Sequence, residues 1–186
     1  MKDKLRKELI NKRRSLLKTE VLAKSNQIKN RLFESNEFKQ SSVVLFYVSY
    51  GNEVYTHDMI KECLKNGKKI IVPISNIEKR SLILSELKNW NDLEPGSYNI
   101  LEPKVDKIIE TPIESIDVII VPGVGFDELG CRIGHGLGYY DNLLKESINA
   151  IHIGLAFEFQ IVEKVPIKSH DIPVDIIITE KRRIDC

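Results

Sequence analysis

Residues 42–74 read SVVLFYVSYGNEVYTHDMIKECLKNGKKIIVPI, and their pattern of apolar and polar positions indicates the fold. Ser42–Val48 is a continuous run of β-branched and aromatic residues, which is typical of a buried strand. Thr56–Asn66 has the pattern of a helix that is N-capped by its first residue and followed by Gly67. Lys69–Ile74 is again typical of a buried strand. A strand, a helix and a strand in so few residues predict a right-handed βαβ unit with parallel strands.

The rest of the chain extends this pattern in both directions. The first forty residues contain no Gly and no Pro, and their apolar residues predict two amphipathic helices, with Thr19 as N-cap of the second. Ser81–Leu87 alternates as an edge strand does. Further elements are expected at Asp117–Val121, Ala150–Leu155 and Asp175–Thr179 (strands) and at Tyr139–Glu146 (helix). The expected fold is α/β, a Rossmann-like three-layer sandwich with a largely parallel central sheet and two N-terminal helices, in a single domain over residues 1–186.

Composition excludes several classes of protein. With 42% apolar and 30% charged residues, the chain has the mix of an ordinary globular domain rather than a disordered or collagen-like one. Its most apolar stretch, Ile116–Phe126, is far shorter than the ~20 residues that span a bilayer. The three cysteines form no CxxC pair and follow no signal peptide, so we expect reduced thiols, a cytoplasmic location and no structural zinc site.

Charge is distributed unevenly along the chain. Residues 1–40 hold 12 Lys/Arg and 5 Asp/Glu, whereas the other 146 hold 16 and 22. A basic arm on an acidic body indicates an anionic partner, for which polyphosphate, nucleic acid and a membrane surface are all candidates. Lys2 and Arg6 are four residues apart, on one face of the first helix, where they either reach a phosphate or form a solvated face.

Glycine points to the functional loop. Residues 121–144 read VPGVGFDELGCRIGHGLGYYDNLL, and six of the ten glycines fall between Gly123 and Gly138. Ligands of open α/β sheets bind where strands lead into loops and helices, and glycine-rich loops present backbone N–H groups to anions. The segment therefore predicts a phosphate cradle, although it matches neither a Walker-type P-loop nor the dinucleotide GxGxxG pattern.

Several side chains in this segment have two readings. Arg132 pairs with a phosphate or forms a surface ion pair, and His135, between two glycines, suits a ligand contact. Tyr139 and Tyr140 either close over a flat ring or belong to the core. Asp141 is either a Mg²⁺ ligand beside the phosphates or a carboxylate that favours the start of a helix.

Other acidic and histidine residues are less informative. Glu53 follows the first strand, at the edge of the sheet where sites form, but is equally an ordinary loop acid. Asp171 is a second candidate carboxylate for a metal or a turn residue. His57 and His152 are expected to have structural or surface roles.

Together these residues resemble the 5-formyltetrahydrofolate cyclo-ligase family, also called 5,10-methenyltetrahydrofolate synthetases. Val121–Leu144 is similar to the family pattern PG-x-x-F-D-x-x-G-x-R-[LI]-G-x-G-x-G-Y-Y-D-x-x-L, and Lys2–Arg6 to K-x-x-L-R. Phe46–Glu53, Phe157–Gln160 and His170–Asp175 follow in the right order. The resemblance covers essentially the full length of the chain.

The resemblance implies an enzyme that uses ATP and Mg²⁺ to cyclise 5-formyltetrahydrofolate to 5,10-methenyltetrahydrofolate, releasing ADP and phosphate. Its implied intermediate is a phosphorylated formyl group that N10 attacks, so the protein mainly positions groups and neutralises charge. The implied catalytic residues are Arg132 and Tyr140, and the implied Mg²⁺ ligands are Asp141 and Asp171. The implied ATP-binding residues are Lys2, Asp3, Lys4, Leu5, Arg6, Arg132, Ile133, Gly134, His135, Gly136, Leu137, Gly138, Tyr139 and Tyr140. The implied folate-binding residues are Val48, Glu53, Gly134, His135, Gly136, Leu137, Gly138 and Tyr139, with Tyr98 as a candidate for stacking.

Two positions depart from the family pattern. Leu137 stands where many members have Gly or Lys, and Asn142 where many have Arg. The apolar Leu137 removes a possible phosphate contact or narrows the loop. The expected partners are a reduced formylfolate and ATP, and the protein is expected to be a monomer that binds neither nucleic acid nor a membrane.

The alternative function is that of a nucleotide- or RNA-binding module that uses the basic N-terminal helices, although these helices lack interleaved aromatics. A sugar-phosphate isomerase or CoA-transferase relative would share the sheet but not the RxGxGxGYYD run.

Overall fold

The computed structural model of the chain describes residues 2–166 and 171–186, so His170 of the C-terminal segment considered above lies outside the described residues. The α-helices are α1 (Lys2–Arg14), α2 (Lys18–Glu34), α3 (Asn36–Gln40), α4 (His57–Lys65) and α5 (Tyr139–Glu146). The strands are β1 (Val43–Leu45), β2 (Lys69–Asn76), β3 (Ser81–Leu87), β4 (Leu93–Pro95), β5 (Leu101–Pro103), β6 (Val118–Val121), β7 (Gly125–Phe126), β8 (Arg132–Ile133), β9 (Ile151–Leu155), β10 (Ile176–Ile178) and β11 (Arg183–Asp185). Short 3-10 helices are η1 (Trp90–Asp92), η2 (Ser97–Asn99), η3 (Val105–Lys107), η4 (Ile113–Ser115) and η5 (Glu158–Gln160).

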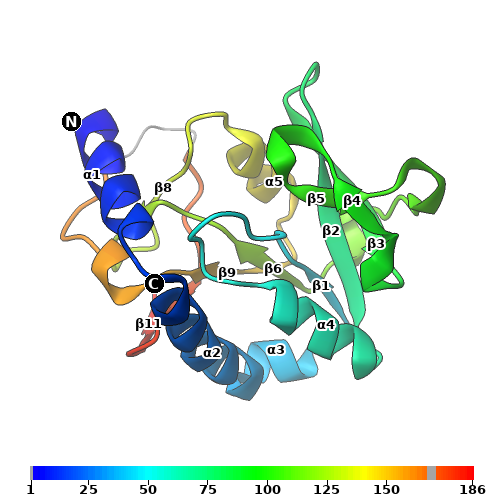
Figure 1. The fold of residues 1–186 in the computed structure, drawn as a ribbon, viewed down its shortest axis with the longest axis horizontal. Helices are drawn as coiled ribbons and strands as arrows, with labels where there is room; N and C mark the ends of the chain where they lie inside the picture. The colour runs from blue at the N-terminus through cyan, green and yellow to red at the C-terminus, as the bar shows by residue number, and fades with distance from the viewer. Residues whose placement is uncertain (1, 167–170) are drawn as a thin grey trace.

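A central sheet confirms the predicted α/β fold. Within the described residues, seven strands pair in the order β11-β10-β9-β6-β1-β2-β3 (Figure 1). The five inner strands are parallel, and the edge strands β3 and β11 are antiparallel to their neighbours. Because parallel strands end at the same edge of a sheet, the loops after β1 and β6 open side by side.

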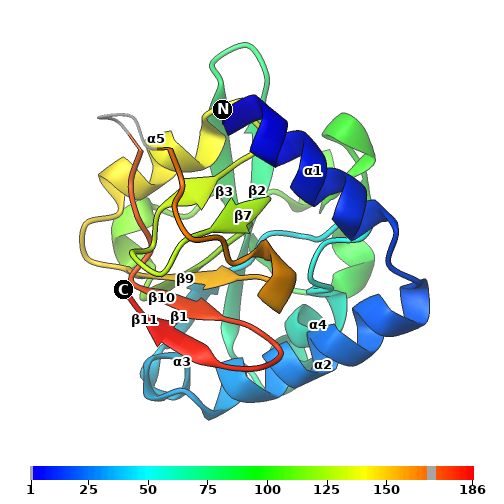
Figure 2. The ribbon, with the colours of Figure 1, turned by 90° about the vertical axis from the view of Figure 1, so that its left-hand side faces the viewer.

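Side-chain alternation along the strands builds two helix-covered faces. Val44 and Ile120 pack on the face covered by α2, α3 and α4, whereas Leu45 and Ile119 pack on the face covered by α5 (Figures 1 and 2). Each fully buried aliphatic side chain stabilises the fold by about 1.5–3 kcal/mol. The three-layer arrangement thus follows from inner strands such as β1, β6 and β10, which are apolar at every position.

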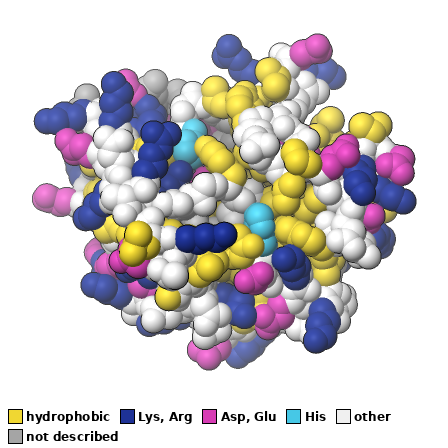
Figure 3. Space-filling view, viewed as in Figure 1, with side chains coloured by type: hydrophobic (Ala, Val, Ile, Leu, Met, Phe, Trp, Pro, Cys, Tyr) yellow, Lys and Arg dark blue, Asp and Glu magenta, His cyan; other side chains and the backbone are white. Residues whose placement is uncertain are grey.

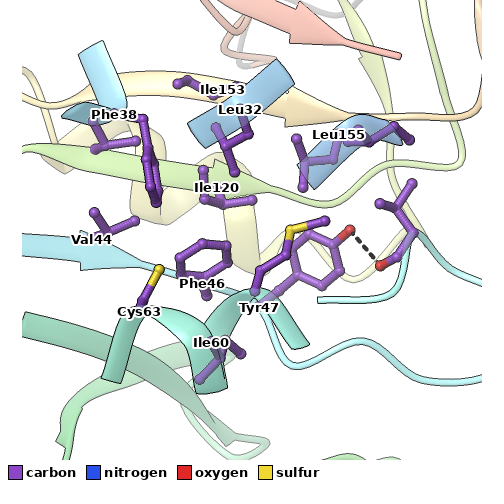
Figure 4. Packing of buried hydrophobic residues seen from close by; sticks show 14 of the residues in the cluster. Leu32, Phe38, Val44, Phe46, Tyr47, Ile60, Cys63, Ile120, Ile153 and Leu155 are labelled. Carbon is purple, nitrogen blue, oxygen red and sulfur yellow. Dashed lines mark hydrogen bonds between the residues drawn. The ribbon is translucent and has the colours of Figure 1, made fainter. Parts of the chain in front are cut away.

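The first helical layer is packed around Phe46, just beyond β1. Figure 4 shows Phe46 between the strands and side chains of α2–α4, among them Ile60 and Cys63. Next to it, the hydroxyl of Tyr47 donates a hydrogen bond of 3.1 Å to the Val54 carbonyl (Figure 4). This bond closes the loop that follows β1, at the edge of the sheet where the site lies.

The helix ends differ in part from the prediction. The predicted N-cap at Thr19 is wrong, because α2 begins after Leu17 and the Glu20 carboxylate accepts a hydrogen bond from the Leu17 N–H at 2.9 Å. Thr56 does precede α4, but its hydroxyl donates to the Tyr47 carbonyl at 2.7 Å instead of capping the helix. Gly67 follows α4 as predicted, with a left-handed φ of 76°.

Three pairings were not expected from the sequence. β11 is an antiparallel edge strand beside β10, and β4–β5 and β7–β8 form two-stranded sheets of their own. The predicted first strand is also shorter than expected, since the ladder of β1 ends at Leu45.

The surface is mixed in charge. Basic and acidic side chains are interspersed on the face shown in Figure 3, with hydrophobic side chains gathered toward its middle and right. None of the helices in the described part of the chain combines the length and apolar character that crossing a bilayer requires.

Candidate active site

A cavity of about 360 Å³ lies at the carboxyl edge of the sheet. Its walls come from α1, the loops after β1 and β8, the end of β2 and the turn of the β4–β5 hairpin. The sequence-predicted residues that line it are Lys2, Val48, Glu53, Arg6, Tyr98, Arg132, Gly134, His135, Gly136, Leu137, Gly138, Tyr139, Tyr140, Asp141 and Asp171. Segments far apart in the chain therefore meet where the sequence placed the site.

Four residues predicted to bind ATP do not line this cavity, and they are Asp3, Lys4, Leu5 and Ile133. Ile133 is fully buried beneath the glycine loop, in a small apolar cluster with Leu9 of α1. Asp3 is exposed, but its carboxylate pairs with Arg6, which does line the cavity. His57 and His152 also lie away from the cavity lining. His57 Nε2 shares a hydrogen bond with the Ser49 carbonyl, and His152 Nε2 shares one with the Ser147 hydroxyl.

Helix α1 presents its cations to the cavity because of their spacing. Lys2, Arg6 and Leu9 fall on one face of the helix, and Leu9 anchors that face in the apolar cluster. Gly125 leaves room for this contact, since a Cβ there would lie 2.5 Å from Leu9 Cδ1. Lys2 Nζ then reaches Asp171 Oδ2 at 2.6 Å, and Arg6 Nε donates to the Gly134 carbonyl at 2.9 Å. Figure 2 shows α1 crossing the molecule beside β7.

The glycine loop turns directly into α5. Gly136 and Gly138 have φ of 99° and 79°, a left-handed conformation that a side chain would strain, and Gly138 is the N-cap of α5. The helix N-terminus and the loop N–H groups favour an anion at this point. Of the six clustered glycines only Gly134, Gly136 and Gly138 line the cavity, so the cradle is shorter than the glycine count indicated.

Arg132 and Tyr140 form a buried pair next to the loop. Arg132 is only 6% exposed; its guanidinium donates to the Asp141 carboxylate and lies 5.8 Å from the centre of the Tyr140 ring. Burial, and next the negative charge of Glu53, raise the pKa of Tyr140 well above its usual value, so the hydroxyl stays protonated. Within the described residues, neither Arg132 Nε nor the Tyr140 hydroxyl has a hydrogen-bond partner. Two such buried polar atoms are suited to a ligand oxygen.

Glu53 is a buried carboxylate in the cavity wall, beside His135 of the glycine loop. It is 6% exposed, and its Oε2 accepts a hydrogen bond from the Tyr50 N–H at 3.2 Å. Its Oε1 lies 3.4 Å from His135 Nε2 and 3.8 Å from an Arg13 guanidinium nitrogen. The carboxylate is therefore held in place and still faces the cavity.

Comparison with known proteins assigns the family. The model of the 5-formyltetrahydrofolate cyclo-ligase family matches residues 1–180. The chain belongs to the 5-formyltetrahydrofolate cyclo-ligase family. It is 30% identical to the 5-formyltetrahydrofolate cyclo-ligase of Mus musculus, over 95% of this chain and 92% of that protein. It is 31% identical to the Saccharomyces cerevisiae enzyme of the same name, over 85% of each chain.

Solved structures agree with this assignment. The fold is similar to that of the Aquifex aeolicus 5,10-methenyltetrahydrofolate synthetase, with a TM-score of 0.87 and 36% identity over 99% of this chain and 92% of that one. A Mycoplasma pneumoniae 5,10-methenyltetrahydrofolate synthetase shares the fold at a TM-score of 0.77, covering 96% and 98% of the two chains. The chain is thus an enzyme of the cyclo-ligase family.

The predicted Mg²⁺ ligands of this cyclo-ligase are already paired with cations. Asp141 contacts Arg132 and Asp171 contacts Lys2, and both carboxylates line the cavity. Among the described residues, no group of three or more His, Cys, Asp or Glu side chains is arranged to hold a metal ion. Two carboxylates beside a phosphate site nevertheless suit Mg²⁺, which binds proteins through one or two carboxylates plus phosphates and waters.

Sequence reasoning missed two buried charged residues in or behind this wall, Glu102, which lines the cavity, and Arg13, which contacts Glu53. Glu102 is 8% exposed, lines the cavity, and accepts hydrogen bonds from the Ser75 N–H at 2.9 Å and the Ser97 N–H at 3.2 Å. It thereby fixes the hairpin turn that carries Tyr98. Arg13 was missed although it continues the α1 stripe of Lys2 and Arg6, which was the available signal.

Proposed function

We propose that this cavity binds ATP and 5-formyltetrahydrofolate together, and that the chain cyclises the folate to 5,10-methenyltetrahydrofolate with release of ADP and phosphate. The observation that carries the proposal is the composition of the cavity wall. It joins the cations of α1, a glycine loop at the N-terminus of α5 and carboxylates from separate loops. Cations and loop amides suit a polyphosphate, whereas a buried carboxylate suits the amino and ring N–H donors of a pterin.

The chemistry requires activation of the formyl oxygen, which is a poor leaving group. The oxygen attacks the γ-phosphorus of ATP, and the bond from that phosphorus to the ADP oxygen breaks. N10 then attacks the formyl carbon and gives up its proton, and the phosphate leaves with the former formyl oxygen. The protein supplies alignment and charge neutralisation, as in other phosphoryl transfers.

Each part of the wall then has a role in nucleotide binding. Lys2, Arg6 and the N–H groups of the loop around Gly136 would contact the phosphates. Arg132 would move from Asp141 to the transferred phosphoryl group, whose charge it neutralises. Tyr140 would donate its hydroxyl proton in a hydrogen bond to a reacting oxygen, because its raised pKa keeps it protonated.

The folate and the metal would occupy the remaining groups. Glu53 would accept from the pterin N–H groups, next to the apolar contact of Val48. Asp141 and Asp171 would hold Mg²⁺, which neutralises phosphate charge when bound. Lys2 would then exchange its contact with Asp171 for one with phosphate.

An isotope experiment tests the proposed route. The substrate is 5-formyltetrahydrofolate with ¹⁸O in the formyl group, and inorganic phosphate is analysed by mass spectrometry after turnover with Mg-ATP. The proposal predicts one ¹⁸O atom in each phosphate released. A reaction without ATP controls for exchange of the label with water. Unlabelled phosphate, with the label stable in that control, would exclude a phosphorylated formyl group.

We also propose that the chain works as a single-domain monomer in the cytoplasm and acts on small molecules only. The family match over residues 1–180 supports the single domain. Light scattering of the purified protein should give a mass near 21.4 kDa, with and without ATP. A dimer mass would contradict the proposal.

A further inference from the structure

The face of α1 that brings Lys2 and Arg6 to the cavity continues beyond the residues assigned to ATP. Lys2, Arg6, Leu9 and Arg13 are spaced by four, three and four residues, which keeps all of them on one face of the helix. Lys2 and Arg6 lie toward the glycine loop and Asp171. Arg13, in the last turn, lies beside the loop that follows β1 and is only 8% exposed.

A buried arginine in this position needs a negative charge nearby, and Glu53 provides it as an ion pair. An Arg13 guanidinium nitrogen lies 3.8 Å from Glu53 Oε1, and the side chains of both residues are less than a tenth exposed. The Tyr50 N–H and His135 Nε2 also contact this carboxylate. Arg13 is therefore the permanent positive charge in contact with Glu53.

A second set of contacts fixes the same loop to the same helix. The Asn52 side-chain amide donates to the carbonyls of Arg13 at 3.2 Å, Arg14 at 3.4 Å and Leu16 at 3.0 Å. The Arg13 and Arg14 carbonyls end α1, whose last carbonyls lack partners within the helix, and Leu16 follows two residues later. Adjacent residues, Asn52 and Glu53, thus tie the loop to α1 through backbone and side chain.

We propose that Arg13 is a positioning residue that holds the Glu53 carboxylate at the orientation in which it recognises the folate. This inference rests on the proposed role of Glu53 in folate binding. One rigid helix, α1, then carries Lys2 and Arg6, which face the phosphates, at its start. At its end it carries Arg13, which supports the Glu53 carboxylate that binds the folate. The relative placement of the two substrates is thereby set by α1, which matters because transfer requires the formyl oxygen to align with the γ-phosphorus.

The test measures KM for each substrate separately in matched variants of the full chain. The variants are Arg13→Met, its exposed neighbour Arg14→Met as control, Glu53→Gln, and the Arg13→Met/Glu53→Gln double variant. Rates follow the near-ultraviolet band of the methenyl product. Arg13→Met should raise KM for 5-formyltetrahydrofolate by about tenfold while KM for ATP and kcat change less than about twofold. Arg14→Met should match the unsubstituted chain.

The double variant separates positioning from general structural damage. If Arg13 acts through Glu53, the double variant should have a folate KM within about twofold of Glu53→Gln alone, because the two losses are not additive. Should Arg13→Met fail to fold, Arg13→Lys, which retains the charge but not the fork, should give a smaller rise in the folate KM.

Three results would overturn the inference. An unchanged folate KM in Arg13→Met (or, if that variant does not fold, in Arg13→Lys), with a raised one in Glu53→Gln, rejects Arg13 but leaves the proposed function intact. If the two single-variant increases in the folate KM multiply in the double variant, Arg13 does not act through Glu53. An unchanged folate KM in Glu53→Gln rejects both the inference and the proposed folate contact of Glu53.

Discussion

The Arg132–Asp141 ion pair holds together two groups that the proposed reaction uses separately. Asp141 lies on the first turn of α5 and its side chain is 26% exposed, so its loss leaves the core intact. We expect Asp141→Ala to lower kcat/KM for Mg-ATP by about tenfold or more with little change in the melting temperature. Steady-state kinetics and thermal unfolding, with exposed Lys145→Ala as control, measure both. Full activity in Asp141→Ala would remove Asp141 from the site.

Removing the buried hydroxyl of Tyr140 is expected to lower activity without lowering stability. Within the described residues this hydroxyl has no hydrogen-bond partner, so its removal breaks no bond of the fold. Tyr140→Phe should therefore unfold at the same or a higher temperature. Its kcat should fall on the order of 10²-fold, as when one donor to a charged transition state is deleted. An unchanged kcat would show that Tyr140 only packs against Arg132.

At the level of single residues, the sequence identified groups that belong to a motif and missed those whose role depends on distant loops. Lys2, Arg6, Arg132 and residues 134–141 were predicted, and they line the cavity. Arg13 and Glu102 were missed because the Glu53 carboxylate lies 40 residues from Arg13 in the sequence, and the Ser75 N–H lies 27 residues from Glu102. Only the folded loops bring them together.

At the element scale, the docking of α1 depends on a glycine. A Cβ at Gly125 would lie 2.5 Å from Leu9 Cδ1 and 3.3 Å from the Gln160 carbonyl oxygen. Gly125→Ala should push α1 outward, destabilise the fold by about 1–3 kcal/mol, and raise KM for ATP because Lys2 and Arg6 move with the helix. Denaturant unfolding and ATP kinetics check this. Unchanged values of both would mean that α1 is not held through Leu9.

A second contact between elements predicts how stability depends on acid. Arg183 of β11 donates two hydrogen bonds, of 2.9 and 2.8 Å, to the Glu37 carboxylate of α3. These bonds lower the pKa of Glu37 from 4.5 to about 2. A carboxyl whose pKa is lower in the folded state stabilises the fold above pH 4.5, and this contribution is lost as the pH falls through about 2.

Arg183→Ala removes the cause of this shift. The free energy of unfolding of the variant should therefore decline less between pH 4.5 and pH 2 than that of the unsubstituted chain. Urea unfolding at several pH values gives the slope of the free energy of unfolding against pH for the variant and for the unsubstituted chain, with Lys181→Ala as control. Equal slopes would show that the Glu37–Arg183 contact does not contribute to stability.

Among the elements, those with long apolar runs were predicted and those made by pairing alone were not. β2 and β6 lie in the runs KIIVPI and DVIIV, and they are where we expected them. β11 lies in the polar sequence KRRIDC and is a strand only because β10 offers it an edge. β7 and β8, of two residues each, are too short for any periodicity to show.

At the scale of the whole molecule, the fold places the first helix against loops from the second half of the chain. Arg6 bonds the Gly134 carbonyl across 128 residues, and Lys24 of α2 pairs with Glu180 across 156. The parallel sheet makes this possible, since the loops after β1 and β6 leave from one edge. This arrangement supports the proposal that both substrates bind at one cavity rather than at separate sites.

The measurement that tests this account most directly is the conversion of 5-formyltetrahydrofolate by the purified chain. The near-ultraviolet band of the methenyl product is followed with Mg-ATP, without ATP and without Mg²⁺. The account predicts a band that grows only when ATP and Mg²⁺ are both present, with one phosphate released for each methenyl product. A flat trace from folded protein that binds ATP, or a band that grows without ATP, would contradict it.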